Sequence, residues 1–432
     1  MPIDTQPTLL TYCLPIPTEG PLEMREQLFR HSVREYTQSE LLTSWETKDG
    51  VIRRVLLTLQ EEGKICFDLV AQARQHLVEK GMRIRDIAAQ QAHVTGGANV
   101  GHEGVHTVQG GWGTGGRKDH DHGESVYHPP RTTLVVSPKY MHVERCFQAL
   151  DGYLGTPIAH NRLVEFNENG EVVREVPGGM VQITTLVVSF PESFTLSALL
   201  KAIRLQLRRK VHELVQHGKV IVPDLILGSP SVVNPQLIRE HLFKYAVTTL
   251  ILIGFSKRHA RLAESQYAPG LWGFLRELVT DGIHVVLSAT PAVMDIYDQD
   301  DVRQMFPCGP HSITAIRPED ASTSMLYYWG LLGVEEPMQD EFVEFAYRGG
   351  FQRGLIEPQV LDFNRRVNLQ GQPWREALQK SGKLTGDMKN LGVVFENVLQ
   401  GKAITLAEAT KYRDELPLGV KITGQLDMRR QS

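Results

Sequence analysis

The chain has 432 residues, of which 41% are hydrophobic and 22% charged, a composition that excludes an intrinsically disordered protein. This length exceeds one ordinary hydrophobic core and predicts a main domain of roughly 200 residues or more with flanking modules. A formal net charge of -4 excludes a protein that coats nucleic acid over its whole surface, so any DNA contact has to be local.

The first 20 residues and the spacing of the cysteines indicate the cellular compartment of the protein. Residues 1–20 carry no positively charged leader, and no apolar run reaches the roughly 18 residues that span a bilayer. We therefore expect a soluble, cytoplasmic protein with no membrane partner. The cysteines show no CxxC spacing, so neither a disulfide framework nor a zinc ribbon is predicted. We expect reduced, mostly packing residues at Cys13, Cys66, Cys146 and Cys308.

Residues 1–92 are predicted to form a helical N-terminal region. In VIRRVLLTLQEEGKICFDLVAQARQHLVEKG, the apolar residues Val51, Val55 and Leu59 repeat at helical spacing, and Gly81 is a helix-stop signal. This region therefore precedes the main domain as a set of amphipathic helices.

Residues 93–130 are rich in glycine and histidine and predict a loop or linker. The run DHDH makes His120 and His122 metal candidates, because imidazole with carboxylate suits zinc or another transition metal. No CxxC or HExxH spacing supports such a site, and a polar, glycine-rich loop is the alternative. Gly111 and Gly116 have phosphate-loop spacing, but no predicted helix follows them.

Strands and helices alternate from residue 131 to residue 310. TTLVVS, QITTLVVSF, TTLILIGF and IHVVLSATP are apolar on both faces, and helical stretches such as LSALLKAIRLQLRRKVHELV separate them. This pattern predicts an α/β core, a parallel sheet sandwiched between helices. Residues 311–368 turn helical and predict a lid, and residues 369–432 predict a C-terminal tail that docks partners.

The order of these segments resembles the TnsC/TniB group of AAA+ ATPases, the target-selection regulators of DNA transposons. RTTLVVSPKYMHVERCFQAL lies where that family has its first strand, phosphate loop and first helix, and QITTLVVSFPESFTLSALLKAIRLQL is similar to the second strand and its helix. PQLIREHLFKYAVTTLILIGF matches the Walker B strand, GFLRELVTDGIHVVLSATPAV looks like sensor 1, and EFVEFAYRGGFQRGLIEPQVLDFNRRV resembles the lid. The resemblance covers a little over half of the chain and implies the P-loop NTPase architecture of AAA+ proteins.

The segment at the phosphate-loop position departs from that family. A phosphate loop needs glycines that turn backbone N–H groups onto the phosphates, then a lysine and a serine or threonine. Residues 124–151 contain no glycine, Pro138 removes one N–H donor, and Lys139 is not followed by serine or threonine. Ser137, Pro138, Lys139 and His142 are therefore predicted to belong to a degenerate nucleotide site.

The Walker B and sensor 1 positions add to this prediction. Gly254 and Phe255 stand where the family carries the acids that hold magnesium and aim the attacking water. Thr290 matches the polar residue of sensor 1, although without the two Walker motifs a plain strand-terminal turn is an equal interpretation. Losses in two motifs that work together predict a pseudo-ATPase.

Two basic clusters are candidates for DNA contact. In the resembled family, rings and filaments grip the DNA backbone with basic residues, which implies phosphate contacts here. A solvated helix face is the default interpretation, because acidic residues lie near both clusters. The candidates are Lys201, Arg204, Arg208, Lys257, Arg258 and Arg261.

We therefore predict a non-catalytic accessory or adaptor subunit in DNA transposition. It would contact an AAA+ regulator, a transposase or a target-site protein, as a hetero- or homo-oligomer, with DNA as a further candidate partner and no cofactor. One alternative is an active, ATP-dependent DNA-binding regulator with an atypical nucleotide site, which would need ATP and magnesium. Another is a metal-dependent or DNA-binding adaptor in which the α/β core is only a scaffold.

Overall fold

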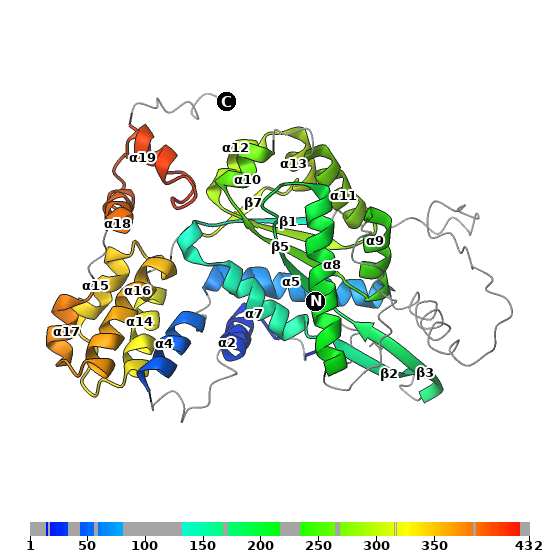
Figure 1. The fold of residues 1–432 in the computed structure, drawn as a ribbon, viewed down its shortest axis with the longest axis horizontal. Coiled ribbons are helices and arrows are strands. Elements are labelled where there is room, and N and C mark those ends of the chain that lie inside the picture. The colour runs from blue at the N-terminus through cyan, green and yellow to red at the C-terminus, as the bar shows by residue number, and fades with distance from the viewer. Residues whose placement is uncertain are drawn as a thin grey trace.

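The computed structural model describes most of the chain apart from its two ends and several internal segments (Figure 1). The glycine- and histidine-rich segment, with His120, His122, Gly111 and Gly116, lies outside the described residues. The described residues are 14–15, 18–32, 44–55, 59–80, 132–166, 172–216, 234–263, 268–314, 316, 318–382 and 386–423.

A five-stranded sheet lies at the centre of the fold, and every neighbouring pair in it is parallel. The strand order is β4-β5-β6-β1-β7, so β1 lies between β6 and β7. This is the strand order of AAA+ proteins, and the predicted fold class is confirmed. The strands are β1 (Thr132–Val136), β4 (Thr185–Ser189), β5 (Thr249–Phe255), β6 (His284–Ala289) and β7 (Pro310–Ser312).

Helices cover both faces of the sheet (Figure 1). Alternate residues of each strand face opposite sides, so Val135 and Ile251 belong to one hydrophobic cluster while Leu134 and Leu250 belong to another. The first cluster includes α2 (Pro21–Ser32), α5 (Gln60–Lys80) and α7 (Glu144–Leu154). The second includes α8 (Leu196–Gln216), α9 (Pro235–Lys244), α11 (Ala268–Thr280), α12 (Met294–Tyr297) and α13 (Asp300–Met305).

The lid is a helical bundle that also contains a helix from the N-terminal region. Its own helices are α14 (Pro318–Leu332), α15 (Asp340–Arg348), α16 (Arg353–Asn364), which continues into a π-helical turn (Arg365–Leu369), and α17 (Trp374–Lys380). Helix α4 (Trp45–Arg54) packs against α14 and α16, as Figure 1 shows. The predicted N-terminal region therefore contributes α2 and α5 to the core and α4 to the lid.

An antiparallel hairpin, β2 (Ile158–Phe166) with β3 (Val172–Gln182), is inserted between α7 and β4. It was not predicted from the sequence, because IAHNRLVEF and VVREVPGGMVQ are partly polar and lack a continuous apolar run. Figure 1 shows the hairpin extending away from the central sheet.

The C-terminal tail contains α18 (Gly386–Leu399) and α19 (Leu406–Lys411). In Figure 1 the chain after α19 turns back toward the central sheet. None of the described helices has both the length and the apolar character needed to cross a membrane.

The buried Lys48 of α4 provides a test of the assignment of α4 to the lid. Its Nζ donates to the Leu332 carbonyl oxygen at 2.7 Å and to Asn368 Oδ1 at 3.1 Å. We expect Lys48→Met to lower the free energy of unfolding by about 1–3 kcal/mol, because the carbonyl at the C-terminus of α14 and the Asn368 amide oxygen each lose a charged donor. Urea denaturation measures this change, and Lys389→Met at an exposed position of α18 is the control. Equal effects of the two substitutions would contradict the assignment.

Candidate functional site at the carboxyl edge of the sheet

Ligands of open parallel sheets bind at the carboxyl ends of the strands, and here β1, β5 and β6 end at one edge. The strand ends are hydrogen-bonded to one another: the Ser137 N–H donates to the Ala289 carbonyl at 3.0 Å, and the Thr290 N–H donates to the Phe255 carbonyl at 2.8 Å. The structure thus brings Ser137, Thr290 and Phe255 together at this edge.

The turn after β1 is closed on itself. Pro138 is followed by a short 3-10 turn (Lys139–Met141), and His142 adopts the left-handed conformation with φ 53°. The Met141 N–H donates to the Pro138 carbonyl at 2.9 Å, and the His142 N–H donates to the Lys139 carbonyl. These donors are bonded within the turn, whereas a phosphate loop holds its N–H groups open for the ligand.

A buried ion pair lies beneath this turn and joins three parts of the chain. Arg353, the first residue of α16, donates to both carboxylate oxygens of Glu62 in α5, at 2.7 and 2.5 Å. A third bond of 3.0 Å runs from its guanidinium to the Met141 carbonyl. The two side chains are only 4% and 0% exposed. We call this set of contacts the Arg353–Glu62 clamp.

A second ion pair fixes the start of α7 to the same lid helix. The guanidinium of Arg145 donates to both carboxylate oxygens of Glu357, one of them at 2.9 Å. Burial raises the pKa of Glu357, and the cations Arg145 and Arg353 oppose that shift. The lid is therefore tied to the core on both sides of the turn.

His142 packs against the lid at a point where only glycine fits. A Cβ atom added at Gly354 would lie 2.7 Å from the imidazole ring. Burial lowers the pKa of His142 to about 4, and the cations of Arg145, Arg353 and Lys139 act in the same direction. The imidazole is thus neutral at pH 7.

The C-terminal tail lies across the edge and places a carboxylate in it. Asp414 Oδ1 accepts from the Lys257 N–H at 2.7 Å and from Thr290 Oγ1 at 2.5 Å. The Asp414 carbonyl accepts from the Lys139 N–H at 2.8 Å. Lys257 Nζ donates to the Thr410 carbonyl at 2.6 Å. The carboxylate therefore contacts the residues that follow β5 and β6, and the backbone carbonyl of the same residue contacts the β1 turn.

Apolar packing and one more ion pair hold this tail segment in place. Tyr412 and Leu416 are buried in a small cluster with Leu355 of the lid. Arg413 pairs with Asp295, which lies after β6, at 2.6 Å. The tail thus bridges the core and the lid independently of the Arg353–Glu62 clamp.

Phe255 and Gly254, the residues predicted to occupy the Walker B position, differ in their surroundings: the first is buried and the second is exposed. Phe255 is fully buried, and its ring packs at 5.1 Å from Phe190 and 5.3 Å from His259. Gly254 is exposed with φ 87°, and an added Cβ would meet open space. The aromatic side chain therefore belongs to the hydrophobic core.

The six basic candidates do not form one exposed surface. On α8, Lys201 and Arg208 are exposed, whereas Arg204 is only 6% exposed and lies in the protein interior. Arg258 and Arg261 of α10 (Lys257–Leu262) are exposed, and Arg258 pairs with Glu192 at 2.9 Å. The side chain of Lys257 is occupied by the tail, as described above.

The part of the chain that the structure describes contains no candidate metal site. No group of three or more histidine, cysteine, aspartate or glutamate side chains has the arrangement of a metal site there. His120 and His122 fall outside those residues, so this prediction stays a prediction.

Sequence reasoning missed Glu62, Arg353 and Asp414, which close the edge. Each lies in a segment where a charged residue is ordinary: Glu62 follows Glu61, and Asp414 stands between Arg413 and Glu415. The best available signal was Arg353, because it opens an apolar lid helix three positions after the glycine pair Gly349-Gly350. Its partner is 291 positions away, which no local pattern reveals.

Comparison with known proteins adds one distant likeness. No family model matches the chain, and no curated protein matches its sequence. Among solved structures, the chain is similar to a Walker-type ATPase of Pyrococcus abyssi, at 11% sequence identity and a TM-score of 0.36. The match covers 58% of this chain and 66% of that chain, just under two thirds of its length. The chain's own strand order defines an AAA+-like α/β protein, and membership of the TnsC/TniB group stays a prediction.

The Arg353–Glu62 clamp predicts a large effect of a single substitution. Arg353→Met should lower the free energy of unfolding by about 3–5 kcal/mol, because it leaves the Glu62 carboxylate buried without its counter-charge. Urea denaturation is the measurement, and Arg348→Met, which breaks the exposed pair with Glu344, is the control, with an expected effect below about 1 kcal/mol. The double variant Arg353→Met with Glu62→Met should recover part of the loss. Equal losses in the free energy of unfolding for Arg353→Met and Arg348→Met would show that the clamp stabilises the fold no more than an exposed ion pair does.

His142 predicts a pH dependence of stability. Its pKa is about 4 in the folded chain against an ordinary value of 6.5, so the unfolded chain binds a proton first as the pH falls. The free energy of unfolding should decrease between pH 6.5 and about 4, by up to about 3 kcal/mol from this group.

The variant His142→Asn isolates this effect, because asparagine tolerates the left-handed conformation and does not titrate. The wild-type protein should lose more stability than the variant across this window, and the difference cancels the opposite contributions of Glu144 and Glu357, whose pKa values are raised by burial. Parallel pH profiles of the two proteins would show that His142 is not buried in this way.

Proposed function

We propose that this protein is a non-catalytic AAA+-like subunit that acts through protein–protein contacts, with DNA transposition as its setting. The observation that carries the proposal is the closed carboxyl edge of the sheet. Where a nucleotide would need open N–H donors and two acids for magnesium, this chain has a self-bonded turn, a buried ion pair and the carboxylate of Asp414.

Charge supports the same conclusion as the missing motifs. Arg353, the lid residue that reaches the turn, is paired with Glu62. Its positive charge is therefore compensated within the protein and does not attract a phosphate. The Asp414 carboxylate adds a negative charge at the edge, and Glu415 stands next to it. A triphosphate would have to displace the tail and break the clamp. The N–H groups of Met141 and His142 would still be bonded within the turn.

A fixed lid suits a structural subunit. AAA+-type oligomers form their interfaces from the core and the lid, so retaining both without a nucleotide site favours a scaffold or adaptor role. The candidate partners are an active AAA+ regulator, a transposase and a target-site protein, as the segment order suggests. Lys201, Arg208 and Arg261 are the exposed basic residues that remain for a DNA backbone contact.

A direct titration with magnesium-ATP tests the proposal. We expect no heat of binding and no change in the thermal unfolding midpoint, because no phosphate cradle is present. A genuine site at 100 times its Kd would stabilise the fold by about 2.7 kcal/mol, a shift of a few degrees. Such a shift would favour the alternative, an active regulator with an atypical site that binds ATP and magnesium.

The variant Asp414→Ala separates a missing site from a blocked one. We expect it to remain unable to bind magnesium-ATP, since the Met141 and His142 N–H groups stay bonded within the turn and the Arg353–Glu62 clamp persists. Asp387→Asn removes the same charge from an exposed position of the tail and serves as the control. Binding by Asp414→Ala alone would mean that the tail merely covers a working nucleotide site.

The partner claim needs its own experiment. Chemical crosslinking and mass spectrometry on the purified chain, mixed with a candidate AAA+ regulator or transposase, should give crosslinks to the lid or the tail. A chain that stays monomeric with each of the three partner classes would contradict the adaptor role.

A further inference from the structure

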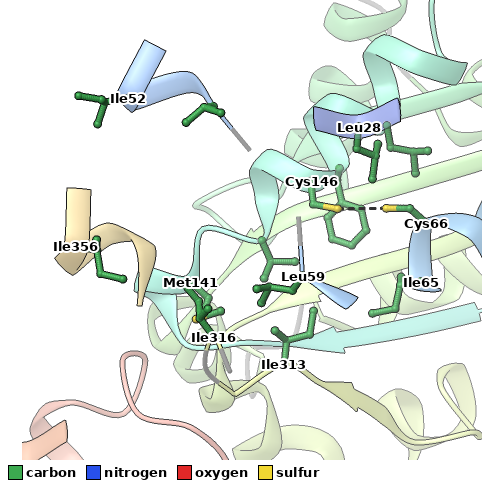
Figure 2. Packing of buried hydrophobic residues seen from close by; sticks show 14 of the residues in the cluster. Leu28, Ile52, Leu59, Ile65, Cys66, Met141, Cys146, Ile313, Ile316 and Ile356 are labelled. Carbon is green, nitrogen blue, oxygen red and sulfur yellow. Dashed lines mark hydrogen bonds between the residues drawn. The ribbon is translucent and has the colours of Figure 1, made fainter. Parts of the chain in front are cut away.

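Two buried thiols face each other between α5 and α7. The Sγ atoms of Cys66 and Cys146 lie 3.2 Å apart, as Figure 2 shows. Both cysteines are free, and they are 0% and 1% exposed. They sit in the apolar cluster that also contains Leu28 and Ile65.

We propose that Cys66 and Cys146 are an oxidisable pair, which a diazene oxidant or a small-molecule disulfide converts into a cystine that ties α5 to α7. The two helices belong to different parts of the chain, since the thiols are 80 positions apart. The bond would attach the N-terminal region covalently to the AAA+-like core.

The geometry favours this bond over other fates of the thiols. A disulfide needs its sulfurs about 2.05 Å apart, so the pair has to close by roughly 1.2 Å, a movement within the reach of side-chain rotation. Each sulfur already contacts the other as its hydrogen-bond partner. Cys308, in contrast, is exposed and has no cysteine neighbour among the described residues.

Burial sets the conditions under which the pair reacts. The contact with Cys66 and burial together raise the pKa of the Cys146 thiol, so the reactive thiolate is scarce while the helices are closed. Oxidation therefore proceeds through a local opening of α5 from α7. The pair reports how often these helices separate.

The position of the pair links it to the Arg353–Glu62 clamp. Glu62 lies one helical turn before Cys66 on α5, and Cys146 follows Arg145 on α7. A cystine would hold α5, and with it the Glu62 carboxylate, against the turn after β1. Oxidation is thus predicted to lock the closed edge, and this consequence rests on the proposed function.

The chemistry balances with either oxidant. Two S–H bonds break and one S–S bond forms, and the two electrons and two protons pass to the N=N bond of diazenedicarboxamide, which becomes a hydrazine. With a small-molecule disulfide, thiol–disulfide exchange gives the same cystine and releases two small thiols.

The experiment uses the full chain with Cys13→Ser and Cys308→Ser, so that only the pair remains. The folded protein is treated with diazenedicarboxamide, alkylated in denaturant with N-ethylmaleimide, and analysed by intact mass and non-reducing peptide mapping. We expect one intramolecular Cys66–Cys146 bond and an unfolding midpoint several degrees higher, restored by dithiothreitol. Cys66→Ala in the same background should show neither change.

Two results would overturn the proposal. One is the absence of the bond in folded protein under conditions that form it in the unfolded chain. The other is a bond that lowers the unfolding midpoint, because the oxidised geometry would then be incompatible with the fold. The variant Glu62→Gln should oxidise at least about tenfold faster if the clamp holds the helices closed, and an unchanged rate would exclude that link. These experiments contain no nucleotide. A negative result would therefore overturn the disulfide proposal without bearing on the magnesium-ATP test of the proposed function.

Discussion

The guanidinium of Arg353 lies between the Glu62 carboxylate and the Met141 carbonyl, and this buried contact sets the relation of lid, core and N-terminal region. Taking two charges out of water costs several kcal/mol per ion unless their hydrogen bonds are satisfied. Here the carboxylate has a bidentate partner and the cation has a third acceptor. The arrangement is therefore specific, because loss of either partner leaves a buried charge without compensation.

This constraint explains why the other parts of the site are closed. Once Arg353 is held under the turn, α16 approaches so closely that Gly354 has no room for a side chain against His142. The Arg145–Glu357 pair then aligns with the same helix, and the tail crosses the edge with Asp414 bonded to Thr290 and Lys257. Protein groups thus join core and lid at the carboxyl edge of the sheet.

The parts of the fold that were predictable from sequence are those set by local apolar patterns. The four main strands, their helices and the lid were expected from such runs, and the segment order predicted an AAA+-like sheet. Ser137, Gly254 and Thr290, which the sequence predicts to belong to one site, lie at the carboxyl edge for the same reason, because each lies near or directly after the end of a buried strand.

Long-range pairings were not predictable, since periodicity shows that a residue is buried but not what it contacts. Glu62 and Arg353 were not singled out, because nothing local distinguishes them from surface charges. Arg204 was predicted to be part of a solvated basic face, yet all three residues are buried. Likewise, α4 has the pattern of any amphipathic helix, and only the structure shows that Lys48 caps the lid helix α14.

Amide hydrogen exchange at the turn after β1 tests the central claim most directly, because it observes the N–H groups that a nucleotide would require. The account predicts that the amides of Lys139, Met141 and His142, which are bonded to the protein's own carbonyls, exchange slowly and at the same rate with and without magnesium-ATP. Fast exchange in the free protein that becomes slow with magnesium-ATP would show an open phosphate loop and contradict the account.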